Sequence, residues 1–212
     1  MTELQLLSTL ETRVLGVLVE KEATVPDTYP LTLNSLVAGC NQKSSREPVM
    51  NLSEGQVKEA LDDLRRRSLV VESSGGRAWR YAHNVPRALG LGSSETALIT
   101  ALWLRGPQTS GELRINAERF YRFADLSSVE GYLEDMATRT PPLVVKLPRA
   151  PGAREARWTH LYCGTPDLSA ALKPVHASPA PVEDGVAQRL AALEARVTQL
   201  EDEVTRLKSP AT

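Results

Sequence analysis

Basic and aromatic side chains gather around two short segments of this sequence that have the pattern of β-hairpins. The first segment follows three consecutive arginines at 65–67, and its strand-like part lies at 77–83 beyond a Gly75-Gly76 turn. The second segment runs from 143 to 160 and carries four basic residues against the single acid Glu155. Guanidinium and ammonium groups bind phosphate oxygens well, so this pattern favours hairpins that contact a nucleic-acid backbone.

A third basic stretch, NQKSSREP at 41–48, lies between two predicted helices. A helix-to-helix loop of this length in a small domain is often functional, so we expect it to be a contact surface for DNA or for protein. Together with the two hairpins and the helix before the first of them, it gives ten candidate phosphate contacts: Lys43, Arg46, Lys58, Arg65, Arg77, Arg80, Lys146, Arg149, Arg154 and Arg157.

The same residues also have interpretations that need no ligand. Arginines at a helix C-terminus interact favourably with the helix dipole, which would explain 65–67 by itself. Trp79 and Trp158 occupy matching hairpin positions, and packing on their own helices is favoured over stacking on bases.

Apolar periodicity predicts the elements that position these residues. Helical stripes with spacings of three and four run through 7–18, 33–40 and 57–64, and Ser53 with Gln56 forms a capping-box pattern at the start of the third helix. The order helix, helix, helix, hairpin recurs with helices at 93–104, 109–120 and 126–139. We therefore predict a mainly α fold with small β-hairpin wings (α+β), built as two tandem winged-helix domains at 1–86 and 87–166.

The charges on the two third helices are unfavourable for reading DNA bases. On the first of them, acidic and basic side chains cancel, with the acids in the early and middle turns. On the second, Glu130, Glu134 and Asp135 oppose only Arg139. An acidic face is repelled by the phosphates that line a groove, so we expect backbone contacts rather than base contacts.

The end of the sequence predicts a dimer. A Pro- and Ala-rich linker at 167–184 precedes a heptad pattern at 185–208. Valines at a positions with leucines at d positions favour a parallel two-stranded coiled coil, whereas antiparallel pairing would place Arg196 against Arg196. The alternative is that this helix folds back on its own domains. The seam residues expected at the dimer interface are Leu190, Leu193, Val197, Leu200, Val204 and Leu207.

Composition argues against several other classes. Cys40 and Cys163 are the only cysteines and the three histidines lie far apart in sequence, so no metal or cofactor site is expected. No glycine-rich phosphate loop or nucleophile elbow is present, and we expect no enzymatic activity. No apolar stretch approaches about 20 residues and no signal peptide is recognised, so we expect a cytoplasmic protein without a membrane partner.

The sequence resembles a known family in three stretches. These are LETRVLGVLVEKEATVPDTYPLTLNSLVAGCNQKSSREPVMNLSE, LRGPQTSGELR and VVKLPRAPGAREARWTHL, which together cover roughly residues 8–164. They look like the bacterial YceH-like family, and the resemblance implies a tandem winged-helix fold and a cytoplasmic location. It implies no activity or ligand, and the wing tip at 73–77 is not expected to match.

Two functions remain open from the sequence. The leading prediction is a duplex DNA-binding protein of regulatory or architectural type, with wings and the 41–48 loop on phosphates. The net charge of −1, from 25 basic and 26 acidic residues, gives no bulk signal for nucleic acid. The alternative is therefore a non-enzymatic scaffold that binds an unidentified protein.

Overall fold

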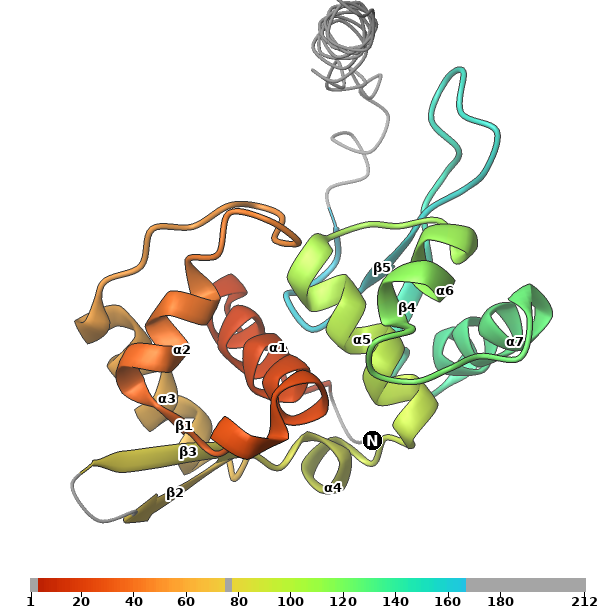
Figure 1. The fold of residues 1–212 in the computed structure, drawn as a ribbon. Coiled ribbons are helices and arrows are strands. Elements are labelled where there is room, and N and C mark those ends of the chain that lie inside the picture. Colours follow the sequence, from red (N-terminus) through yellow and green to blue (C-terminus); the bar gives the residue numbers. More distant parts are fainter. Residues whose placement is uncertain (1–3, 75–77, 167–212) are drawn as a thin grey trace, which may run out of the picture. The chain divides into compact units, whose positions relative to one another are not determined.

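The computed structural model describes residues 4–74 and 78–166, which form helices and small antiparallel sheets (Figure 1). The first part contains α1 (Thr9–Thr24), the 3₁₀ helix η1 (Pro26–Thr28), β1 (Leu31–Thr32), α2 (Leu33–Cys40), α3 (Glu54–Arg66), β2 (Val70–Ser74) and β3 (Trp79–His83). The second part contains α4 (Val85–Leu89), α5 (Ser93–Arg105), α6 (Ser110–Ala117), α7 (Leu126–Thr138), β4 (Val144–Lys146) and β5 (Trp158–His160). The predicted α+β class is confirmed.

Side chains at the helix N-termini explain where several helices begin. The Ser53 hydroxyl accepts a hydrogen bond from the Gln56 N–H, and Gln56 Oε1 accepts one from the Ser53 N–H, which confirms the predicted capping box of α3. Thr109 and Glu112 form the same arrangement at α6. Asp125 caps α7 by accepting from the Ser128 N–H. These caps satisfy backbone donors that would otherwise lack partners in the first helical turn.

Each of the two parts ends in a β-hairpin. In the first sheet the strand order is β1-β3-β2, all antiparallel, with Leu31 and Glu72 on either side of Tyr81. The second sheet contains β4 and β5 alone, with Val145 opposite Thr159. Sequence periodicity predicts both hairpins but not β1, η1 or α4, because each of these is too short to show a period.

The two helix-and-hairpin repeats share one hydrophobic core. Helix α1 packs against α2 and α3 of its own repeat and against α5 of the next (Figure 1). At the α1–α5 contact, a Cβ added to Gly16 would lie 2.9 Å from Leu104 Cδ2, so the helices approach closely. The Leu7 N–H also donates to the Tyr162 carbonyl at 2.7 Å. The repeats are therefore joined by packing as well as by the chain.

The matching tryptophans do not have matching environments. Trp158 is 3% exposed and lies within the core, as the packing interpretation predicts. Trp79 is 57% exposed, so that interpretation is wrong for it. The reason is its position: Trp79 pairs with Ser74 at the turn end of the hairpin, where the neighbouring β2 residues Ser73 and Ser74 are exposed.

Several predictions fall on residues that the structure does not describe. Arg77 lies in the gap between 74 and 78, and the linker and all six seam residues of the predicted coiled coil lie beyond 166. Among the helices of residues 4–74 and 78–166, none has the length and apolar character needed to cross a membrane.

We predict that Gly39→Ala lowers the free energy of unfolding by about 1–3 kcal/mol, because its new Cβ would overlap the α1 core. That Cβ would lie 2.6 Å from Val17 Cγ1, and both residues are buried. Gly131→Ala in α7 is the matched control, since its Cβ would meet nothing within 4 Å, and it should stabilise by about 0.5–1 kcal/mol. Urea unfolding of both variants tests this, and a Gly39→Ala protein as stable as the wild type would contradict the packing.

Candidate nucleic-acid interface

Two basic residues of α3, Lys58 and Arg65, form ion pairs with the first hairpin. Glu72 on β2 lies 2.5 Å from an Arg65 guanidinium nitrogen and 3.5 Å from Lys58 Nζ. Asp62 adds contacts to both, at 3.5 and 3.3 Å. Two of the expected phosphate contacts, Lys58 and Arg65, thus already face two carboxylates, which reduces their attraction for an anion.

Three more candidates are used to hold the fold. Arg80 donates to the Pro30 carbonyl at 2.8 Å and thereby ties β3 to the segment before β1. Arg157 donates to the Pro107 carbonyl at 2.9 Å and to Glu112 at 3.1 Å. The ammonium of Lys146 lies 5.3 Å from the centre of the Trp158 ring, within the range of a cation–π contact.

Arg149 and Arg154 have a different environment. Both are exposed on the loop 147–157, which extends well beyond the short strands β4 and β5 (Figure 1). The base of the loop is closed by a hydrogen bond from the Leu147 N–H to the Arg157 carbonyl at 2.7 Å. Its tip turns at Gly152, which has a φ of 82°. Within residues 4–74 and 78–166, neither arginine has a hydrogen bond or an ion pair.

Arg46 lies in the interior instead of on the surface expected for a phosphate contact. Its guanidinium binds both carboxylate oxygens of Glu20 and donates to the Gly39 carbonyl at 3.1 Å and to Gln42 at 3.0 Å. The physical reason is that Glu20 is only 2% exposed, and a buried carboxylate requires a paired cation. Sequence alone does not show which arginine supplies it.

Glu20 is surrounded by more positive charge than Arg46 supplies. Lys21 Nζ lies 3.6 Å from one carboxylate oxygen and an Arg119 nitrogen 3.7 Å from the other. Burial alone would raise the pKa of Glu20, but the hydrogen bonds and charge of Arg46, with the charges of Lys21 and Arg119, lower it below its ordinary value. We call Glu20, Lys21, Arg46 and Arg119 the junction cluster, because it joins α1, the 41–48 loop and the turn after α6.

The 41–48 loop is held in place by buried arginines. Arg13 donates to the Cys40 carbonyl at 3.2 Å and to the Pro48 carbonyl at 2.7 Å, so it bridges the two ends of the loop. Arg105 from α5 donates to Ser45 at 2.7 Å. Burial, followed by the charges of Arg119 and Arg46, lowers the pKa of Arg105. Lys43 is exposed on this loop.

Sequence reasoning missed Lys21, Arg105 and Arg119 because they come from three separate segments. It also missed Arg114 and Arg122. The available signal for Arg122 was the segment RFYRF at 119–123, in which basic and aromatic residues are mixed. Within the described ranges, no three His, Cys, Asp or Glu side chains meet in a way that could hold a metal ion.

Comparisons with known proteins place these features in a wider group. A family model described as "Protein of unknown function, DUF480" matches residues 7–153. A UPF0502 protein of Delftia acidovorans is 56% identical over 199 residues, which cover 92% of this chain and 88% of that protein. A UPF0502 protein of Leptothrix cholodnii is 54% identical over 204 residues, covering 96% and 91%. The expectation of a bacterial family without an assigned activity is confirmed, while the YceH-like name stays a prediction.

We predict that Glu20→Gln lowers the free energy of unfolding by about 3–5 kcal/mol, because it leaves the Arg46 guanidinium buried without a counter-charge. Glu22→Gln is the matched control on the same helix, where the carboxylate is half exposed and bonded to His83, and it should cost no more than about 1 kcal/mol. Denaturant unfolding at neutral pH measures both, and equal effects would contradict a special role for Glu20.

The pH dependence provides a second readout of the same prediction. When folding lowers the pKa of a glutamate, the ionised carboxylate stabilises the folded protein at pH values above the ordinary pKa of about 4.3. That stabilisation is lost as the pH falls and the carboxylate becomes protonated. The difference between wild type and Glu20→Gln should therefore shrink as the pH falls below about 4.3.

Proposed function

The chain belongs to the DUF480 family of proteins of unknown function, and we propose that it binds duplex DNA through the loop of its second hairpin. The observation that carries this proposal is the difference between arginines that have partners in the described residues and those that have none. Most arginines of the described residues are engaged in ion pairs or hydrogen bonds, whereas Arg149 and Arg154 are exposed together on the protruding loop 147–157. Glu155 is the only acid in that loop.

We further propose that each repeat is a winged-helix domain. Support comes from the order of three helices followed by a hairpin, which occurs twice, with β1 added to the first hairpin. In such a domain the third helix commonly enters the major groove while the wing reaches phosphates. The exposed acids Glu54 and Glu59 on α3, and Glu130 and Glu134 on α7, disfavour that use of the helices here.

Binding through a wing has a predictable character. Phosphate contacts fix position on the duplex but carry no direct sequence information. We therefore propose a DNA-binding protein with weak sequence preference and strong salt dependence, in a regulatory or architectural role without catalysis, acting in the cytoplasm. Lys43, exposed on the 41–48 loop, is a further cation available for backbone contact.

We also propose that two chains associate through a parallel coiled coil at 185–208. Support comes from the sequence pattern alone, in which valine a positions alternate with leucine d positions. A dimer would present two copies of the 147–157 loop, and linked binding raises the overall affinity for one DNA duplex without any new contact.

The alternative proposal is a protein-interaction scaffold. It is favoured by Val71 and Trp79, two large exposed apolar side chains on the first hairpin, and by the acidic surface of α7. Absence of duplex binding at low salt would favour this alternative.

We predict that changing Arg149 and Arg154 together to alanine weakens binding to random-sequence duplex DNA and lowers the slope of log affinity against log salt by about 2. The reason is that each phosphate contact contributes about 0.9 to that slope. Fluorescence anisotropy of full-length protein between about 50 and 200 mM salt measures it.

The matched control is the double variant Arg66→Ala, Arg87→Ala. It removes the same formal charge from exposed positions outside the loop. It should leave most of the salt slope in place. If both double variants lower the slope equally, net charge and not the loop governs binding, and the proposed contact is wrong.

A further inference from the structure

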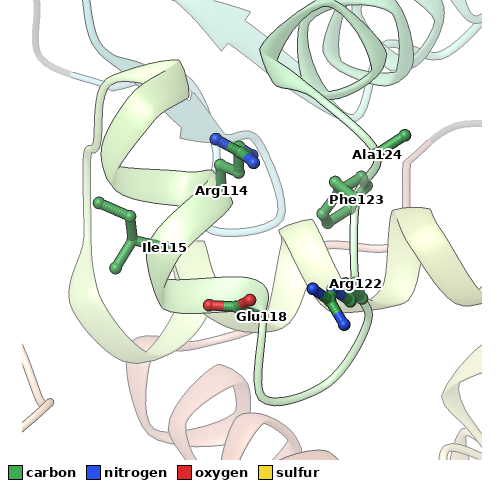
Figure 2. Close-up of a pocket in the computed structure, with 6 residues that line it drawn as sticks. All are labelled: Arg114, Ile115, Glu118, Arg122, Phe123 and Ala124. Carbon is green, nitrogen blue, oxygen red and sulfur yellow. The ribbon is translucent and has the colours of Figure 1, made fainter.

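A hollow of about 390 Å³ lies between α6 and the segment that leads to α7 (Figure 2). Its size is within the range of about 300–1,000 Å³ that is usual for small-molecule sites. In Figure 2, Arg114 and Glu118 extend from α6, while Arg122 and Phe123 lie across from them on the other segment. The hollow is lined by Arg114, Ile115, Glu118, Arg122, Phe123 and Ala124.

Two unpaired cations face this hollow. Of the arginines in residues 4–74 and 78–166, the side chains of Arg87, Arg114, Arg122, Arg149 and Arg154 make no hydrogen bond or ion pair within those residues. Two of these therefore line one hollow, against the single lining carboxylate of Glu118. Guanidinium groups bind carboxylate and phosphate with paired, charge-assisted hydrogen bonds.

Asp125, which follows the lining residue Ala124 in sequence, already accepts hydrogen bonds from Ser128. Asp125 accepts hydrogen bonds of 2.7 Å from both the Ser128 N–H and the Ser128 hydroxyl, as the cap of α7. These bonds, with a smaller contribution from the charge of Arg114, lower the pKa of Asp125. Asp125 thus offsets part of the charge of Arg114.

The hollow also offers apolar surface. Phe123 is buried and packs edge-on against Tyr121 at 4.9 Å and Tyr132 at 6.0 Å between ring centres, so it forms a fixed wall. Ile115 is 70% exposed, so its side chain is available to a ligand in the hollow. A ligand with an apolar body would cover both residues. The Glu118 carboxylate would accept a hydrogen bond from a hydroxyl or amine of that ligand.

We propose that this hollow binds a small organic anion. Its phosphate or carboxylate head lies between Arg114 and Arg122, and its apolar body lies against Phe123 and Ile115. The site uses none of the residues assigned to DNA contact, so its test stands apart from that of the DNA-binding proposal.

The experiment is isothermal titration calorimetry of the full-length protein with matched probes. Adenosine 5′-monophosphate and 4-hydroxybenzoate carry the two head groups, adenosine and phenol lack them, and inorganic phosphate lacks the body. We expect one of the two organic anions to bind at least tenfold more tightly than its neutral counterpart and than inorganic phosphate. Which of the two binds identifies the head group.

Variants test whether the anion binds in this hollow. The double change Arg114→Gln, Arg122→Gln should weaken the binding of that anion at least tenfold, and Arg87→Gln, an exposed arginine on α4, should leave it unchanged. Arg122→Gln alone carries the test if the double variant does not fold. The proposal would be overturned if neither organic anion binds, or if the neutral probes bind as tightly as the anions. It would also be overturned if Arg87→Gln weakens binding as much as the double variant does.

Discussion

The placement of the 41–48 loop depends on one buried ion pair, between Glu20 and Arg46. Glu20 belongs to α1, which packs on both repeats, and Arg46 belongs to the loop that follows α2. A buried carboxylate without a partner is costly, so this pair requires the 41–48 loop to fold back onto α1. Once there, the loop donates from the Glu47 N–H to the Leu104 carbonyl at 2.8 Å, which attaches it to α5. Arg119 brings the turn after α6 to the same carboxylate.

Internal contacts of this and other kinds determine how positive charge is distributed over the described residues. A chain with a net charge of −1 has no general attraction for nucleic acid, so local surfaces must supply it. Internal contacts use the basic side chains of α3, the first hairpin and the base of the second hairpin. Among the described residues, the basic side chains that remain are Arg149 and Arg154 on the protruding loop, Lys43 on the 41–48 loop, Arg87 on α4, and the two arginines of the hollow beside α6. Recognition is thereby assigned to loops, while the helices serve as the scaffold that holds them.

Much of the fold follows from the sequence because its signals are local. The stripe that ends at Cys40 and the Ser53–Gln56 cap each involve residues a few positions apart, and both predict the observed helices. The site follows less well because its pairings are distant in sequence. No feature of the sequence near Arg46 indicates that its side chain is buried by pairing with Glu20, 26 positions earlier. The different exposure of Trp79 and Trp158 likewise depends on how far each hairpin extends past its helices, which a repeat pattern does not show.

The central claim, that the second hairpin loop is the DNA contact, is tested most directly by NMR. Backbone amide shifts of the uniformly ¹⁵N-labelled protein would be followed during titration with a short duplex at low salt. The proposed contact predicts the largest shifts at residues 149–157, smaller ones near Lys43, and little change along α3 and α7. Shifts concentrated on α3 or α7, with the 149–157 amides unchanged, would contradict it and indicate that the third helices bind the duplex.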